Sequence, residues 1–493
     1  MQVTQLLEKI ENMVAMNKSS LFKMSENLLQ NLEEQAKTEK IRAEKRMMKV
    51  KKQRQDLRAS LDQIHQSSLR IDLLGFKRAG KSSTGNTILG EDVFELCSTT
   101  KCENRVGEVA GRQVTVVDTP SCLWKAGMTN TPEFFKQETV LSVSLCDPGP
   151  HALLLLIRID VCFNSQYRQE VQQYLALFSG DIWSHTMVLF TCGDWLGDTT
   201  IEQHIESEEH LRYLVEKCGN RYHVLNNKNR AGDQVTELLE KIEEMVAGNK
   251  NCHFEMDRKR LEEVKERRRN EEQRATERLM KVEKQRLHLQ SLKHELYYIF
   301  SGNSCPRSRF RVVLLGYKGS GKSSSGNTIL GREEFDLKRR TAQCVKRQGE
   351  VAGRQVTVVK APGWWNDVSL KDTPELTKQE IVLSVSLCPP GPHILLLNVR
   401  IDYAFTVDLK RNIQQHMEYL SERVWSHTMV LFTCGEWLGD TTIEQHIESE
   451  EALQSLVEKC GNRYYVLNNE YRDNKQVTQL LEKIEEMVAG NGG

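Results

Sequence analysis

The chain repeats itself at the scale of a whole domain. The phrase WSHTMVLFTCG-WLGDTTIEQHIESEE occurs at 183–209 and again at 425–451, and its copies differ only at Asp194 and Glu436. A second phrase, GEVAGRQVTVV, also occurs twice, and the copies of both phrases lie 242 residues apart. Solenoid repeats are only roughly 20–50 residues long. The sequence therefore predicts two related domains, each able to bury a core of its own.

A third phrase extends the repeat to the start of the chain. QVT-LLEKIE-MVA begins at Gln2, Gln234 and Gln476, so the first of these copies has no domain body before it. We expect 1–19 to be the terminal helix of a truncated repeat. On this interpretation the chain descends from, or is a fragment of, a longer array.

Composition argues against several classes of protein. Lys and Arg together number 68, as do Asp and Glu, and this balance argues against a nucleic-acid-binding chain. The longest apolar run, Ala152–Ile157, has six residues and is too short to span a membrane. Thirteen cysteines without CxxC pairs, in a chain that begins without a signal-peptide pattern, fit the reducing cytoplasm and indicate no zinc site.

Short apolar runs alternate with amphipathic stretches such as 201–218 in each large segment of the chain. This order predicts α/β domains with a doubly wound, mostly parallel sheet, which we place at 68–250 and 308–493. In the first copy the strands are expected at 73–74, 114–117, 153–157, 187–190 and 222–225.

A charged, net basic helical arm is expected before each domain, at 20–67 and 251–307. Arg54 and Arg286 interrupt a weak heptad seam in these arms. The apolar positions of the seam are Ala43, Met47, Val50, Leu57, Leu61 and Ile64 in the first arm and Ala275, Leu279, Val282, Leu289 and Leu296 in the second. Three interpretations stay open: an extended solvated helix between domains, an oligomerising coiled coil, and a basic surface that touches an anionic membrane.

Each domain begins with a phosphate-binding motif. GFKRAGKSS at 75–83 and GYKGSGKSS at 316–324 both fit G-x-x-x-x-G-K-S/T directly after a predicted strand. In such a P-loop, backbone N–H groups and the positive end of the following helix cradle phosphates. Lys81 and Lys322 would reach the β- and γ-phosphates, while the hydroxyls of Ser82 and Ser323 would ligate Mg²⁺. The other loop residues expected at the two sites are Gly75, Lys77, Arg78, Ala79, Gly80 and Ser83, and Gly316, Lys318, Gly319, Ser320, Gly321 and Ser324.

Two further motifs complete the expected site, one near the metal ion and the γ-phosphate and the other near the base. DTPS at 118–121 ends a predicted strand, where Asp118 would hold Mg²⁺ through water and the Ser121 N–H would meet the γ-phosphate. TCGD ends another strand and contributes Thr191 and Asp194. A carboxylate accepts hydrogen bonds from the N1–H and exocyclic amine of guanine, whereas adenine has no N1–H donor. The sequence therefore favours GTP and GDP and argues against a motor-like ATPase.

These motifs and three longer ones resemble the GTPases of immunity-associated proteins, the GIMAP or IMAP family, which are relatives of septins. GKSSTGNTILG at 80–90 and GKSSSGNTILG at 321–331 extend the P-loop as that family does. DPGPHALLLL and PPGPHILLLN are similar to the family's box before the guanine motif. NRYHVLNN and NRYYVLNN are similar to its last guanine-contacting loop, which implies that Asn226 and Asn468 lie near the base.

The resemblance covers most of 70–490 and has functional implications. It implies cytosolic, immunity-linked, switch-like GTPases that dimerise or oligomerise through the G domain when GTP is bound. It also implies that Thr100 is the switch threonine that contacts Mg²⁺ and the γ-phosphate. The expected metal-site residues are then Ser82, Thr100 and Asp118 in the first domain and Ser323 in the second.

The two copies are not equivalent. The second differs at three positions of the expected site: Ala342 replaces Thr100, Lys360 replaces Asp118, and Glu436 replaces Asp194. A cation in place of the carboxylate should weaken Mg²⁺ binding or neutralise phosphate directly. We therefore expect the first domain to be the better nucleotide site and the second to be partly degenerate.

Hydrolysis is expected to be slow, and its catalytic residue stays unknown. Cys122 and Trp364 stand where Ras-like enzymes place a water-orienting glutamine, and neither side chain can orient a water in that way. His151 and His393 either close a turn before a buried strand or serve a catalytic or dimer-bridging role.

Two functions follow as alternatives. The first is a guanine-nucleotide-controlled switch that self-associates through its G domains and has weak or assembly-dependent GTPase activity. The second is a mainly non-catalytic interaction scaffold built from decayed G domains. Neither needs nucleic acid or a transmembrane segment, and membrane contact and unknown protein partners stay open for both.

Overall fold

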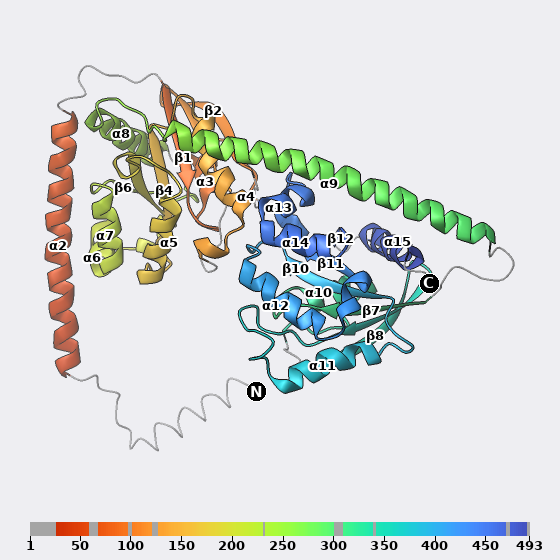
Figure 1. Cartoon of the computed structure of the whole chain (residues 1–493). Coiled ribbons are helices and arrows are strands. Elements are labelled where there is room, and N and C mark those ends of the chain that lie inside the picture. Colours follow the sequence, from red (N-terminus) through yellow and green to blue (C-terminus); the bar gives the residue numbers. More distant parts are fainter. Residues whose placement is uncertain are drawn as a thin grey trace, which may run out of the picture.

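The computed structural model describes residues 26–58, 68–96, 101–120, 127–229, 232–299, 309–338, 342–469 and 474–490. It consists of two α/β units, each preceded in sequence by one long helix (Figure 1). The predicted fold class is confirmed, because each unit has a six-stranded, mostly parallel sheet. The limits predicted for arms and domains stay predictions, and the segment 1–19 lies outside the described residues.

The first sheet has the strand order β2-β3-β1-β4-β5-β6. Only β2 runs antiparallel to its neighbour, among the strands that the structure describes. The sequence patterns do not indicate β2, because most of its side chains are exposed and it has no apolar run. The strands are β1 Ser68–Leu74, β2 Glu103–Val109, β3 Arg112–Asp118, β4 Ala152–Arg158, β5 Thr186–Thr191 and β6 Tyr222–Val224.

Helices cover both faces of this sheet. Strand β4 is buried except at its last residue, and its side chains alternate, so Leu153 and Leu155 join one core layer while Leu154 and Leu156 join the other. The amphipathic stretch at 201–218 forms two helices because the backbone is extended at Glu208, which separates them. The helices are α3 Lys81–Leu89, α4 Glu133–Leu141, α5 Ser165–Leu175, α6 Ile201–Ser207, α7 Glu209–Lys217 and α8 Gly232–Gly248.

The second unit repeats this architecture, with the strand order β12-β11-β10-β7-β9-β8. Its strands are β7 Arg309–Leu315, β8 Val345–Val351, β9 Arg354–Lys360, β10 Ile394–Arg400, β11 Thr428–Thr433 and β12 Tyr464–Val466. Its helices are α10 Lys322–Leu330, α11 Glu375–Ser386, α12 Val407–Glu418, α13 Ile443–Ser449, α14 Glu451–Lys459 and α15 Asn474–Gly490. Short 3₁₀ turns follow β5 and β11, namely η5 Gly193–Leu196 and η7 Gly435–Leu438.

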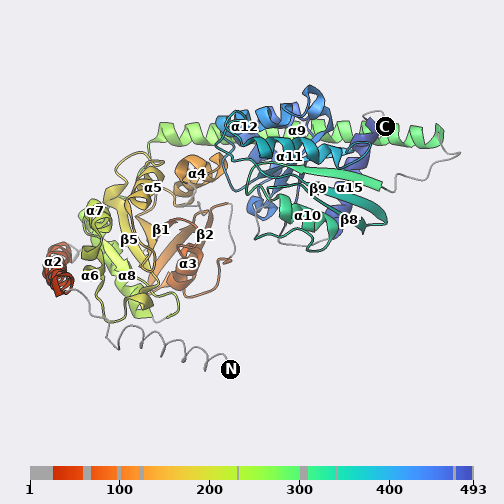
Figure 2. The same ribbon diagram turned by 90° about the horizontal axis from the view of Figure 1, so that it is seen from below.

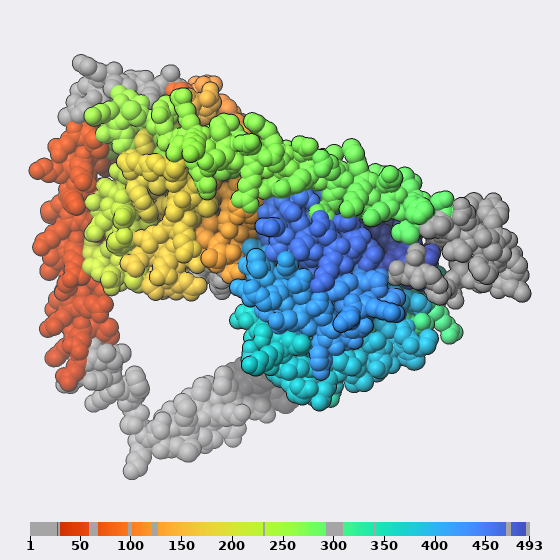
Figure 3. All heavy atoms as spheres, viewed as in Figure 1, coloured from red at the N-terminus to blue at the C-terminus, as the bar shows by residue number. Residues whose placement is uncertain are grey.

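The two arm helices, α2 Glu26–Arg58 and α9 Arg258–Ile299, pack along the domains that follow them in sequence. Helix α2 lies against α6 and α8, and α9 lies against α13 and α15. Helix α9 also contacts α4 of the first unit and so runs along both units (Figures 2 and 3). The arms are therefore packed elements of the fold, rather than the extended solvated helices that one interpretation of the sequence expects.

Arginines, rather than the apolar seam alone, attach each arm to its domain. Arg46 donates to Glu206 at 2.6 Å and to Asn220 at 2.6 Å, and all three side chains are buried. Arg54, which interrupts the seam, donates to Glu244 at 2.7 Å. In contrast, Met47 of the predicted seam is exposed to solvent. A coiled coil between chains is thus not shown.

Among the described helices, none has the length and apolar character needed to cross a membrane.

Candidate functional site

The first P-loop connects β1 to α3 and is held from both sides. Gly80 has a φ of 92°, a left-handed conformation that favours glycine, and it places its neighbour Lys81 at the first position of α3. The Nζ of Lys81 donates to the Gly75 carbonyl at 2.9 Å, which holds this buried side chain across the loop. Thr191, at the end of β5, donates to the Ala79 carbonyl at 2.8 Å. The loop is therefore braced by the same strand that leads to TCGD.

Asp118 and Ser82, which the sequence predicts to hold the metal ion, are in contact. The Ser82 hydroxyl donates to Asp118 Oδ2 at 2.5 Å. Asp118 Oδ1 is buried without a hydrogen-bond partner among the described residues. Burial raises the pKa of Asp118, and the Lys81 charge and the Ser82 hydrogen bond oppose that rise. An unpartnered carboxylate oxygen beside a serine hydroxyl fits a hydrated Mg²⁺ ion.

The residues that the sequence predicts near the base lie in the loops after β5 and β6. Asp194 lies in η5, and its carboxylate accepts from Lys228 Nζ at 2.6 Å, which lowers the pKa of Asp194. Asn226 is fixed by Gln234, whose Oε1 accepts from the Asn226 N–H at 3.0 Å. The exposed Asp194 carboxylate can exchange this lysine for a guanine edge without leaving a buried charge unpaired.

A cavity of about 450 Å³ joins these parts. It brings together Lys77, Arg78, Ala79, Gly80, Lys81, Ser82, Ser83, Thr191, Asp194 and Asn226 from the sequence prediction. Gly75 and Asp118 do not line the cavity, but they accept hydrogen bonds from Lys81 and Ser82, which do. Thr100 and Ser121 lie outside the described residues.

Sequence reasoning missed several residues of this wall. They are Leu96, Arg158, Cys192, Asn227 and Lys228. Asn227 donates to the Thr84 hydroxyl of α3 at 3.2 Å, so it ties the base loop to the P-loop helix. The second asparagine of VLNN was a visible signal for this contact. Arg158 had no such signal, because it is the last residue of the apolar strand β4 and reaches the site only through the sheet order.

The second P-loop is covered by its own chain. Lys322 Nζ donates to the carbonyls of Gly316 and Tyr317 at 2.8 and 2.7 Å. The Lys318 N–H donates to the Trp364 carbonyl at 2.6 Å. A Cβ at Gly363 would lie 2.8 Å from the backbone nitrogen of Lys318, so glycine is needed for this close approach. The segment after β9 thus lies directly on the loop that would hold phosphate.

Three lysines gather at this second loop. Lys360 ends β9 as Asp118 ends β3, and its Nζ donates to the Ser323 hydroxyl at 3.1 Å. Burial and the nearby charges of Lys360 and Lys318 lower the pKa of Lys322 to about 7. This donor set does not fit Mg²⁺, because a cation occupies the place of the metal-side carboxylate. It fits an anion such as phosphate.

The remaining predicted residues of the second domain keep the positions of the first. Gly321 has a φ of 85° before α10, and Gly319 has a φ of 83° where the first loop holds Arg78 at 67°. Ser320 is buried, and its carbonyl accepts from Thr433 at 3.1 Å. Ser324 lies in the first turn of α10. Glu436 lies in η7, and the Asn468 N–H donates to Gln476 at 3.1 Å.

The histidines of the two GPH boxes lie away from the P-loops. His151 Nδ1 accepts from the Arg70 N–H at 3.0 Å, near the beginning of β1, whereas the P-loop follows the end of that strand. His393 makes the same contact with Arg311. The geometry favours the structural alternative for both.

Two residues stand at the position of the water-orienting glutamine. Trp364 is buried and stacks on His416 at a centroid distance of 4.6 Å, and Cys122 lies outside the described residues.

Comparisons with known proteins agree with this arrangement. The profile of the AIG1 family matches residues 69–274 and 310–493. GTPase IMAP family member 8 of Homo sapiens is 30% identical to this chain, over 86% of this chain and 63% of that protein. Immune-associated nucleotide-binding protein 9 of Arabidopsis thaliana is 33% identical over 36% of this chain and 55% of that protein. The chain spans less than two thirds of the length of these curated relatives.

Among solved structures, Toc33 from Arabidopsis thaliana in complex with Mg²⁺ and GMPPNP aligns with a TM-score of 0.31 and 18% identity, over 41% of this chain and 95% of that chain. The family profile covers most of this chain in two separate stretches, and the GIMAP resemblance of the sequence is thereby confirmed. The chain belongs to the AIG1 family and carries that family's domain twice.

Proposed function

We propose that the first domain binds GTP and GDP with Mg²⁺ and hydrolyses GTP slowly, or at a useful rate only when assembled. The observation that supports this most is the cavity of about 450 Å³ in which the P-loop, Ser82 and Asp194 face one space. Lys81 and the loop N–H groups would hold the phosphates, and Ser82 and Asp118 would hold the metal. The bound Mg²⁺ would neutralise charge on the phosphates.

We propose that the second domain is partly degenerate and takes phosphate without a metal ion. The ammonium group of Lys360 beside Ser323 and the covering segment at Gly363 support this interpretation. If that domain binds no nucleotide at all, the scaffold alternative applies to it.

The free thiols of both domains, such as Cys218 and Cys460, suit the cytoplasm that we propose as the location.

Metal chelation should separate the two sites. We expect chelation of Mg²⁺ to leave nucleotide binding nearly unchanged in the Lys81→Ala protein, where only the second site acts. In the Lys322→Ala protein, where only the first site acts, chelation should lower the affinity for nucleotide about tenfold or more, because the phosphates of the nucleotide lose their counter-ion. Isothermal titration with GDP, with and without chelator, measures both. Lys360→Asp in the Lys81→Ala background should introduce metal dependence, and strong metal dependence before that change would refute the proposal.

We also propose that nucleotide controls self-association through the G domains. The face that η7 and α13 form in the second domain is covered, and only 8% of Trp437 is exposed. The corresponding face of the first domain carries Trp195, which is 66% exposed. An exposed aromatic that is buried at the same position of the sister domain marks a surface suited to another G domain.

Sedimentation velocity of the whole protein tests this proposal. We expect larger particles with a non-hydrolysable GTP analogue than with GDP, and Trp195→Ala should shift the distribution toward monomer. Tyr419→Ala, which removes another exposed aromatic, is the control and should keep the larger particles. If the particles have the same size with the GTP analogue and with GDP, the proposed nucleotide switch is refuted and the scaffold alternative applies.

A further inference from the structure

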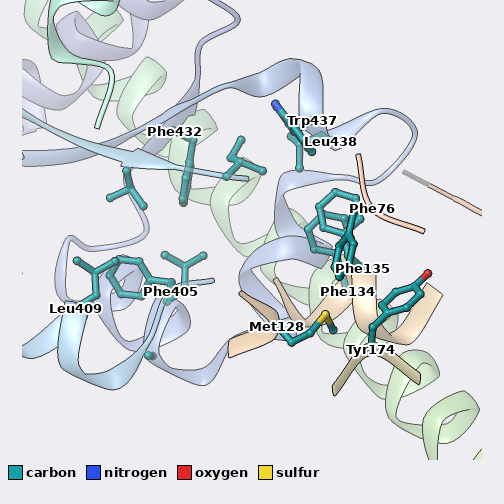
Figure 4. Packing of buried hydrophobic residues seen from close by; sticks show 14 of the residues in the cluster. Phe76, Met128, Phe134, Phe135, Tyr174, Phe405, Leu409, Phe432, Trp437 and Leu438 are labelled. Carbon is teal, nitrogen blue, oxygen red and sulfur yellow. The ribbon is translucent and has the colours of Figure 1, made fainter. Parts of the chain in front are cut away.

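The two domains of the chain meet through α4 of the first and the η7–α13 region of the second (Figure 4). Phe134 contacts the His446 ring edge to face at a centroid distance of 5.2 Å, and Phe135 contacts Trp437 at 6.1 Å. All four side chains are buried. This aromatic contact has the composition of a stable interface core.

Polar contacts fix the orientation of this interface. The Asn130 carbonyl accepts from the Ala404 N–H at 2.8 Å, between the two domains. Helix α9 adds an ion pair between Arg268 and Glu138 at 2.8 Å, with both side chains mostly buried. The position of the second domain on the first is thus set by directional bonds as well as by packing.

The interface reaches the nucleotide site of the first domain. Lys77 is the third residue of the first P-loop and lines the cavity. Its Nζ lies 3.4 Å from the centroid of the Trp437 ring, within the range of a cation–π contact. A side chain of the second domain therefore contacts a residue that lines the phosphate side of the first site.

The second repeat has the same contact within one domain. Lys318 corresponds to Lys77, and its Nζ lies 3.8 Å from the centroid of the Trp365 ring. At the position of Trp365 the first repeat has Leu123, which Trp124 follows, and both residues lie outside the described part of the chain. Among the described residues, Lys77 thus has an aromatic partner from the neighbouring domain, whereas Lys318 has one from its own domain.

We propose that Trp437 is a positioning residue of the first nucleotide site and holds the Lys77 ammonium at the rim of the cavity, where it meets the phosphates of the nucleotide. This inference rests on the proposed function of the first domain. A side chain held in place before binding loses less conformational freedom when the ligand arrives, so the ligand binds more tightly. Trp437 directly follows Glu436, so the turn η7 belongs to both candidate nucleotide sites.

Nucleotide titrations of the whole protein test this role. All variants carry Lys322→Ala, so that the first site is measured. We expect Trp437→Ala to weaken GDP binding about three- to tenfold, the range that a cation–π contact allows. Trp437→Phe, which keeps an aromatic face, should restore affinity to within about twofold. Trp183→Ala removes a cation–π partner of Lys217 elsewhere in the first domain and should have no effect.

A double-mutant cycle separates positioning from general damage to the fold. If Trp437 acts through Lys77, Trp437→Ala should add nothing to the loss caused by Lys77→Ala. Additive losses, or unchanged binding in Trp437→Ala, would overturn the inference and leave the proposed function intact. A parent protein that binds no guanine nucleotide would instead overturn the proposed function, and the inference with it. Thermal unfolding curves identify any variant that fails to fold. If Trp437→Ala fails to fold, the GDP affinity of Trp437→Phe tests the inference instead.

Discussion

Lys81→Ala is expected to remove most of the guanine-nucleotide binding of the protein. The Lys81 side chain is buried across the P-loop, and its Nζ lies 2.9 Å from the Gly75 carbonyl at the wall of the cavity. Hydrogen bonds to charged groups contribute about 1.5–3 kcal/mol each, so the affinity of the first site should fall about 10- to 100-fold. Fluorescence titration with a labelled GDP measures the loss.

Lys322→Ala is the matched control for this prediction. It removes the corresponding lysine from a loop whose Lys318 N–H already bonds to Trp364 and whose Mg²⁺ carboxylate is replaced by Lys360. We therefore expect a smaller change in total binding. Equal losses from the two substitutions would contradict the asymmetry between the domains.

Arg278→Ala is expected to destabilise the second domain by about 3 kcal/mol, because removal of one partner leaves a buried charge unpaired. Arg278 donates to Glu448 at 2.5 Å and to Asn462 at 2.6 Å. Only 8% of the arginine side chain and 4% of the glutamate side chain are exposed. Calorimetry should show the corresponding transition about 6–12 °C lower, by the usual scaling for domains of this size.

Arg260→Ala on the same helix is the control for this second prediction. Arg260 pairs with Glu263 at 3.7 Å, and both side chains are about half exposed. Exposed pairs contribute roughly 0–1 kcal/mol, so little change is expected. If the two substitutions shift the transition equally, α9 contributes only helix propensity, and the buried pair is not what attaches the arm to the domain.

Much of each domain could be predicted from the sequence because its signals are local. The buried strands β4 and β5 each contain a continuous apolar run, and the P-loop needs only eight consecutive residues after a strand. The exposed strand β2 gave no such signal and was missed. The sequence also did not indicate that Glu208 separates α6 from α7. The Glu208 carboxylate accepts a hydrogen bond from the Phe163 N–H, which lies 45 residues away in the chain and so leaves no local signal.

The sequence by itself determined the repeat, the fold class, both P-loops and the replacement of Asp118 by Lys360, because each is visible in a short stretch of residues or in its copy. Only the tertiary structure decided what those residues contact. The arms could not be assigned from periodicity, since their arginines find partners on helices more than a hundred residues away. The contact of Lys77 with Trp437 joins two domains, and no local pattern encodes it. Burial, ion pairing and cation–π contact depend on distances in space, which only the packing of both domains sets.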